Sequence, residues 1–435
     1  MTRHRGLLPP IRRRAVLVGA AVALLAGVAP AVLAQDLSGE LVIMQWQGGT
    51  DLEMWHEVEA KFTQMHPGVT VREFVPAGGQ GDARGGMRTA IMGGEVVDII
   101  INTWPAFRAE LVSAGILRPV EEQWETFGWS ERLGDAWKEL GSIDGVPYGV
   151  TYTYGDRSGI WFKTEHLEKA GIAAPPRTWD EFLASFEQLK AAGYATPVAI
   201  PAKYWAHAEW FESLLLRTAG VDFAAQLARH EVPWTDPKVK ETLMKFAEML
   251  EAGCCGDVAV MLANDLEQSY AQIFRANEAS YLLIGMWVNS TLKNDYGLTE
   301  GEDYSLFQFP ALGLGFDDTS SVDTKELNVT TNGANPAAAD AFLDFIIGPE
   351  AANIMARYGY ASPSTAMDAS LLGPVQQAAT QAVATSKVQF VLGDLLPGDL
   401  VDEYRIQLQR FLQDPSEANI DAVLAAIEAK AAASY

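Results

Sequence analysis

The fold is decided by residues 41–75, which read LVIMQWQGGTDLEMWHEVEAKFTQMHPGVTVREFV. Residues 41–46 form an apolar strand, which a Gly-Gly pair ends. A helix follows with its large side chains, from Trp55 to Phe62, on one face, and residues 69–75 form a second strand. A strand, a helix and a strand in succession indicate a parallel pair joined by a crossover helix.

The same order continues along the chain. Residues 96–101 are apolar on both faces, as a buried parallel strand should be. After residue 150 an extended segment, a helix from Thr178 and a strand at 197–200 repeat the order. A chain of 435 residues with 49% hydrophobic content is too long for one core and suits two lobes. We therefore predict an α/β fold with doubly wound lobes.

Two helix starts carry a recognisable signal. Thr50–Glu53 and Thr178–Glu181 both have the S/T-x-x-E form of a capping box. We expect each threonine side chain to bond the backbone of the glutamate three residues later.

Residues 1–34 have the features of a secretory signal peptide. Arginines precede an apolar run at 15–28, and small residues stand before Gln35, so we expect cleavage after Ala34 and export to the periplasm. A run of about 14 apolar residues is short for a membrane anchor, which needs roughly 20. The pair Arg13-Arg14 suits twin-arginine export, and the general secretory route suits the same residues.

The charge excludes two classes of partner. The formal net charge is −24 at pH 7, and it becomes −29 when the five arginines of residues 1–34 are removed. Nucleic acids and anionic membranes both require neutralising cations, so we expect neither as a partner. An acidic surface also keeps a secreted protein soluble, and we expect a monomer.

The chain has two cysteines, Cys254 and Cys255, which are adjacent. Two sulfurs alone do not make a zinc site. Either they form a vicinal disulfide after export, or they are a structural detail at a helix end beside Gly253 and Gly256.

Motifs for catalysis are missing. The histidines after residue 34 are not paired at metal-binding spacing, and no G-x-S-x-G elbow occurs. The glycine-rich loop at 78–86 lacks G-K-[ST], so we interpret it as a turn. We expect no catalytic residue, no metal and no cofactor.

Four of the 12 tryptophans lie just beyond predicted strands: Trp46, Trp104, Trp205 and Trp287. Ligands of doubly wound sheets bind at the carboxyl ends of the strands, where an indole can stack on a pyranose ring. Nearby polar side chains that could bind sugar hydroxyls are Asp51, Asn102, Asp156 and Arg157. We interpret seven other tryptophans as core residues: Trp55, Trp124, Trp129, Trp137, Trp161, Trp179 and Trp234.

A resemblance rests on four segments in a fixed order: Asp144–Val150, Gly159–Thr164, Lys169–Ile172 and Pro175–Phe182. Together they resemble the signature run of family 1 extracellular solute-binding proteins. The tetrapeptide Ile284-Gly285-Met286-Trp287 is similar to the G-x-W of that family, and residues 335–347 are similar to its late helix. Residues 78–81, 90–94 and 390–394 are most similar to members that bind glucose-type sugars.

The resemblance implies two α/β lobes joined by crossing hinge strands, with the ligand in the cleft between them. We expect the first lobe to comprise residues 35–150 and 322–362, and the second residues 151–321 and 363–435. Matched position by position, the cleft residues of the family fall on Trp46, Gln47, Asn102, Trp104, Tyr154, Asp156, Arg157, Trp205, Trp287 and the segment around Asp323, to which we add Asp51. Gln47 stands where related glucose binders often carry a second aromatic residue.

The sequence therefore predicts a periplasmic protein that captures a neutral mono- or disaccharide by hinge closure and delivers it to the permease of an ATP-binding-cassette importer. Two alternatives stay open at this point. A secreted glycoside hydrolase would also carry cleft aromatics, with two carboxylates at a set separation. A binding protein for a polyol or polyamine would suit the acidic charge, and Asp51, Asp156 and Asp323 are the acids near the candidate loops.

Overall fold

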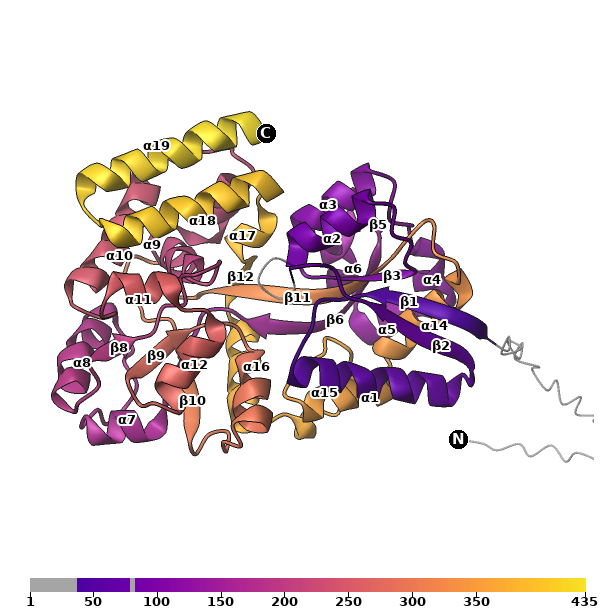
Figure 1. Ribbon diagram of the computed structural model, residues 1–435, viewed down its shortest axis with the longest axis horizontal. Coiled ribbons are helices and arrows are strands. Elements are labelled where there is room, and N and C mark those ends of the chain that lie inside the picture. The colour runs from indigo at the N-terminus through magenta and orange to yellow at the C-terminus, as the bar shows by residue number, and fades with distance from the viewer. Residues whose placement is uncertain (1–36, 79–82) are drawn as a thin grey trace, which may run out of the picture. The chain divides into compact units, whose positions relative to one another are not determined.

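The computed structural model describes residues 37–78 and 83–435 (Figure 1). The predicted signal peptide and most of the glycine-rich stretch at 78–81 lie outside the described residues. Within them, none of the helices combines the length and apolar character needed to span a bilayer.

The first sheet contains six strands and a parallel core. β1 pairs in parallel with β2 and β3, so that Ser38 stands beside Gly68 and Ile43 beside Ile99. The strand order is β12-β11-β3-β1-β2, with β6 also paired to β11. The bounds are β1 Ser38–Met44, β2 Gly68–Phe74, β3 Ile99–Asn102, β6 Gly149–Asp156, β11 Thr319–Val329 and β12 Lys387–Phe390. The three strands predicted from 41–101 are confirmed with ends shifted by a few residues.

Alternation along β1 explains how helices cover both faces of this sheet. Leu41 and Ile43 join the core formed with α1, α14 and α15, whereas Val42 and Met44 join the core formed with α2 and α3. The helices and short strands of this lobe are α1 Thr50–Met65, α2 Ala83–Met92, α3 Pro105–Ser113, α4 Glu121–Thr126, α5 Trp129–Leu133, α6 Asp135–Leu140, β4 Ser142–Ile143, β5 Val146–Pro147, α14 Pro336–Ile346 and α15 Pro349–Arg357. The sheet is therefore doubly wound, as predicted.

The second sheet is smaller and mixed, in the order β10-β7-β9-β8. β8 and β9 are parallel, and β7 is antiparallel to both β9 and β10. The strands are β7 Gly159–Lys163, β8 Thr196–Val198, β9 Ala279–Leu283 and β10 Tyr304–Gln308. The remaining elements are α7 Thr164–Lys169, α8 Trp179–Ala191, α9 Ala208–Ala228, α10 Pro237–Glu251, α11 Val258–Ala263, α12 Leu266–Phe274, α13 Val288–Ser290, η2 Thr291–Asp295, η3 Ala369–Leu371, α16 Pro374–Thr385, α17 Leu392–Leu395, α18 Gly398–Gln413 and α19 Glu417–Ser434.

Two strands connect the sheets. β6 and β11 run side by side and antiparallel, with Asn328 opposite Gly149 and Val322 opposite Asp156 (Figure 1). After β6, only Arg157 and Ser158 separate the first sheet from β7 of the second. The chain therefore has two α/β lobes joined by crossing strands, as the resemblance implied; the residue boundaries assigned to the lobes stay a prediction.

One of the two predicted capping boxes is wrong. At α8 the Thr178 hydroxyl accepts from the Glu181 backbone, and the Glu181 side chain accepts from the Thr178 backbone, which confirms that box. α1, in contrast, starts after Gly49 and has no side-chain cap. The Thr50 hydroxyl instead donates to Asp295 of η2.

The tryptophans assigned to the core are buried in six of seven cases, and Trp137 is half-buried. Trp210, which the sequence analysis left unassigned, is fully buried beside Phe182 and Phe309.

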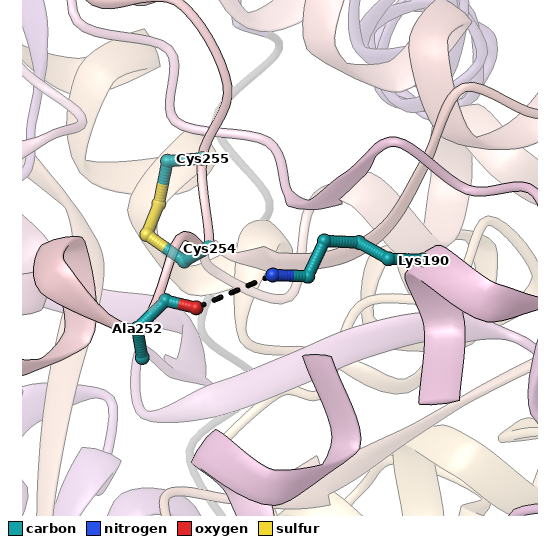
Figure 2. Close-up of a disulfide and its surroundings, with 4 residues drawn as sticks. All are labelled: Lys190, Ala252, Cys254 and Cys255. Carbon is teal, nitrogen blue, oxygen red and sulfur yellow. Dashed lines mark hydrogen bonds between the residues drawn. A yellow bond between two sulfur atoms is a disulfide. The ribbon is translucent and has the colours of Figure 1, made fainter. Parts of the chain in front are cut away.

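The two cysteines form a disulfide in the second lobe. Cys254 and Cys255 are joined through their sulfurs just after α10 (Figure 2). Both side chains are buried in the hydrophobic core of the second lobe. The Cys254 carbonyl accepts from the Val198 backbone of β8 at 2.9 Å. Lys190 of α8 donates to the preceding Ala252 carbonyl at 3.5 Å. Of the two alternatives for this pair, the structure therefore favours the vicinal disulfide.

We predict that protein purified from the periplasm, unfolded without reductant, contains no titratable thiol. After reduction, two thiols should react, because the chain has two cysteines. Titration with a chromogenic thiol reagent checks this, with a Cys254→Ser/Cys255→Ser double variant as the blank. Two reactive thiols before reduction would show that the pair is not oxidised in the native protein.

Candidate functional site

Two adjacent cavities lie between the lobes, with volumes of about 230 Å³ and 160 Å³. Both are lined by Asp51, Trp205, Leu266 and Trp287, so they form one continuous cleft. We call the larger cavity the Tyr270 pocket and the smaller one the Asp394 pocket, after a residue that lines each alone. This cleft is the candidate site.

The first lobe contributes a pair of tryptophans to the Asp394 pocket. Trp46 follows β1 and Trp104 follows β3, and because these strands are parallel neighbours their ends meet at one edge of the sheet. The ring centroids are 4.9 Å apart. Asn102 holds this arrangement, since its side-chain oxygen accepts from the Trp104 backbone at 3.0 Å.

The second lobe contributes Trp205, just before α9, and Trp287, just after β9. Their ring centroids are 6.0 Å apart, and the guanidinium of Arg157 lies 5.4 Å and 4.7 Å from them. Cation–π attraction therefore holds Arg157 against both indoles. The Trp287 ring nitrogen also donates to the Tyr270 hydroxyl at 3.2 Å.

The Trp287 side chain can take its position only because residue 285 is a glycine. A Cβ at this position would lie 2.0 Å from Cζ3 of Trp287 and 2.5 Å from Cδ of Arg157. The G-x-W segment therefore lets the indole fold back over its own backbone and lets Arg157 approach it.

Arg157 is the centre of a buried ion network. It is 6% exposed, donates to Glu209 through Nε at 3.3 Å and through Nη2, and pairs with Asp323 at 3.4 Å. Burial acts to lower the pKa of Arg157, but the charges of Glu209 and Asp323 raise it further, so its pKa is well above the ordinary value. The guanidinium stays charged and fixed at the crossing point of the lobes.

Asp51 lies where the two pockets meet. It accepts from the Tyr360 hydroxyl and pairs with Lys325 at 3.8 Å. Lys325 also lies 4.9 Å from the Tyr360 ring. A carboxylate that keeps free lone pairs beside cationic and phenolic donors can also accept from ligand hydroxyls.

The structure brings most of the predicted site residues together. Those that line the cleft are Trp46, Asp51, Trp104, Arg157, Trp205, Trp287 and Asp323. Whether they contact a ligand stays a prediction.

Four predicted residues lie outside both pockets. Gln47 is buried with its amide 3.5 Å from the Tyr152 hydroxyl, and Asn102 bonds Glu326 at 2.8 Å. Tyr154 packs on Trp137, with ring centroids 5.1 Å apart. Asp156 is 2% exposed and accepts from Ser158, Ser320 and Gln308, so it joins the crossing strands to β10.

Several cleft residues were missed from the sequence. They include Arg84, Lys325, Asp394 and Arg405 in the Asp394 pocket, Glu267, Tyr270 and Asp295 in the other, and Glu209 behind Arg157. Lys325 could have been found, because residues two apart on a strand share a face and Asp323 was predicted. Asp394 lies in residues 390–394, which the resemblance marked without assigning a site residue, and the others lie on helices that carry no motif.

Known proteins resemble this chain over most of its length. A family model described as bacterial extracellular solute-binding protein matches residues 52–353. The alpha-glucosides-binding periplasmic protein AglE of Rhizobium meliloti is 25% identical, over 71% of this chain and 70% of its own length. The osmoprotective compounds-binding protein GgtB of Synechocystis is 29% identical over 163 residues, which span 36% of this chain and only 38% of that protein.

Solved structures share the fold. The bacterial solute receptor AcbH, described as preferring β-D-galactopyranose, superimposes with a TM-score of 0.81 at 19% identity, covering 91% of this chain and 99% of the other. Maltose-bound MalE3 of T. maritima gives a TM-score of 0.74 at 16% identity, covering 90% and 99% of the two chains.

We predict that Asp156→Ala lowers the free energy of unfolding of the ligand-free protein by about 1–3 kcal/mol, because it leaves buried donors without an acceptor. Urea unfolding measures this effect. Asp222→Ala, an exposed aspartate of α9, is the control and should change the unfolding free energy by less than about 0.5 kcal/mol. An Asp156→Ala variant as stable as the control would contradict the structural role.

Proposed function

Because this chain belongs to the bacterial extracellular solute-binding proteins, we propose that it captures a neutral mono- or disaccharide in the cleft and delivers it to the permease of an ATP-binding-cassette importer. The observation that carries the proposal is the cleft itself, where Trp46 and Trp104 of one lobe and Trp205 and Trp287 of the other line a single pocket. Indole faces suit the apolar faces of a pyranose, and the polar groups between them suit its hydroxyls.

Capture proceeds by movement of the lobes about the crossing strands. We propose the lobes as residues 35–150 with 322–362 and residues 151–321 with 363–435. Hydrogen bonds already connect the two lobes: the Thr50 hydroxyl donates to Asp295, and the Arg84 side chain donates to the Leu396 carbonyl at 3.2 Å. A ligand that contacts both lobes favours the closed arrangement, which the permease would recognise. The exported form would be periplasmic, cleaved after Ala34 and monomeric.

The charges in the cleft favour a neutral ligand over a polyamine. The Asp394 pocket is lined by four cationic side chains, Arg84, Arg157, Lys325 and Arg405, and by three acidic ones, Asp51, Asp323 and Asp394. The Tyr270 pocket is lined by three acids, Asp51, Glu267 and Asp295, of which Asp51 pairs with Lys325 and Asp295 accepts from Thr50. A polycation is disfavoured by the Asp394 pocket, where cationic side chains outnumber acidic ones.

Hydrolysis is not part of the proposal. Membership of a solute-binding family supports binding without turnover. Asp156, one of the three acids near the candidate loops, is buried among its three donors outside both pockets.

We predict that a neutral sugar raises the melting temperature by a few degrees, since ligand at 100 times its Kd adds about 2.7 kcal/mol of stability. The panel is D-glucose, D-galactose, D-mannose, maltose, sucrose and trehalose, with spermidine and putrescine as controls. Chromatography of ligand released from the complex should recover it unchanged. A shift with the polyamines alone would refute the sugar proposal, and recovery of cleaved sugar would make the protein an enzyme.

We predict that Trp287→Ala weakens sugar binding by about 2–4 kcal/mol, the range of a buried aromatic anchor. Calorimetric titration measures the affinity, and urea unfolding measures the loss of the contacts with Tyr270 and Arg157. Trp137→Ala is the matched control, because Trp137 is also half-buried but lies outside both pockets. If folded Trp287→Ala protein bound sugar as tightly as Trp137→Ala, the indole would have only a packing role.

A further inference from the structure

Asp394 is a buried carboxylate with too few hydrogen-bond donors. It lines the Asp394 pocket at the start of α17, is 5% exposed, and its Oδ2 atom has no hydrogen-bond partner among the described residues. Buried polar atoms are normally satisfied, so each exception needs an explanation.

The position of Asp394 is set by a second buried acid. Glu212 of α9 accepts from the Leu392 backbone at 2.7 Å, from the Gly393 backbone at 3.2 Å and from the Tyr404 hydroxyl at 3.2 Å. These bonds fix the turn that presents Asp394 to the pocket. The carboxylate is thus held in place by its backbone, while its own oxygens are left short of donors.

Two arginines flank Asp394 without contacting it. Arg84 of α2 and Arg405 of α18 line the same pocket, and the Nε atom of each is buried without a partner in the described part of the chain. Among the described residues, neither arginine forms an ion pair with Asp394; Arg84 instead donates through Nη1 and Nη2 to the Leu396 carbonyl, each at 3.2 Å. Burial raises the pKa of Asp394 to about 6, and the charges of Arg157, Arg405 and Arg84 act to lower it.

The Asp394 carboxylate and the two arginines line the same pocket without forming ion pairs with each other. A ligand group that both donates and accepts hydrogen bonds could bond to the carboxylate and to a guanidinium together. A carboxylate only accepts and a guanidinium only donates, whereas a hydroxyl does both. The two oxygens of one carboxylate can also accept from two hydroxyls at once. Adjacent hydroxyls of a sugar ring have these properties.

We propose that Asp394 selects the hydroxyl pattern of the sugar: its carboxylate accepts from two adjacent hydroxyls of the ring in the Asp394 pocket, and their oxygens accept from Arg405 and Arg84. The inference rests on the proposed function and names its specificity-determining residue. Bonds to a charged acceptor are strong and directional, so a sugar with one of these hydroxyls missing or inverted binds more weakly.

The proposal has a consequence for the free protein. A buried carboxylate without donors destabilises the ligand-free state, and a neutral amide of the same shape removes this penalty. Asp394→Asn is therefore expected to keep or raise the urea midpoint of the ligand-free protein while it weakens binding. A purely structural aspartate would behave in the opposite way.

Calorimetric titration of the sugars in the panel into wild type, Asp394→Asn and Asp402→Asn tests the proposal. Asp402 is an exposed aspartate of α18 and serves as the matched control. We expect Asp394→Asn to bind about 10- to 150-fold more weakly and Asp402→Asn to bind as wild type does. Monodeoxy analogues of the bound sugar identify the hydroxyls: an analogue that lacks a contacted one binds wild type weakly and loses little more with Asp394→Asn.

Arg405→Met removes the second partner of the same hydroxyls. Its affinity should therefore fall for the parent sugar but change little for the monodeoxy analogue that lacks the contacted hydroxyl. If wild type binds a sugar and Asp394→Asn binds it equally well, this inference fails and the proposed function stands; bridging of the charges by water alone would give that result. A loss that is equal for every analogue would also overturn it. A wild type that binds none of the sugars refutes the proposed function, and with it this inference.

Discussion

The burial of one positive charge at the junction of the lobes constrains the rest of the site. Arg157 follows β6 directly, so its guanidinium must enter the interior where the chain passes from one sheet to the other. Such a charge requires partners, and they come from α9 in the second lobe and from β11. The flat guanidinium also lies against Trp205 and Trp287, which explains why position 285 has no side chain. Charge neutralisation, aromatic orientation and the junction therefore depend on a single residue.

The two lobes build their walls of the cleft in different ways. In the first lobe, parallel strands end side by side, and the residues after them, Trp46 and Trp104, meet there, with Asn102 bonded to the Trp104 backbone. In the second lobe only β8 and β9 are parallel, and the wall is held by tertiary bonds such as that from Trp287 to Tyr270. Behind this wall lie two buried acids: Glu209 accepts from the Arg157 side chain, and Glu212 accepts from the Leu392 backbone, so each holds a neighbouring segment in place. The first wall follows from strand topology, whereas the second depends on packing between distant segments.

This difference explains what could be predicted from the sequence. Periodicity locates strands, and strand ends locate residues near them, so Trp46, Trp104 and Trp287 were found. Gln47, one residue beyond Trp46, is buried beside Tyr152 outside the cleft; both residues follow the end of β1 at Met44, where the alternation of strand side chains no longer sets their direction. Glu209 lies 52 residues from its partner Arg157, and Thr50 bonds a residue 245 positions away in place of its own helix end. Local patterns carry no information about such long-range partners. Arg84 and Arg405 were missed because they lie on helices without a motif, whereas Asp394 lies in the segment 390–394 that the resemblance marked but to which no site residue was assigned.

The pairing of Cys254 with Cys255 has a consequence for maturation after export. Proteins with four cysteines can oxidise into three connectivities, and wrong pairs must be exchanged before the native set forms. A chain with two cysteines has a single intramolecular connectivity, and here the partners are neighbours in the sequence, so they are close before any tertiary structure forms. Oxidation therefore needs an electron acceptor but no choice between alternative partners within the chain.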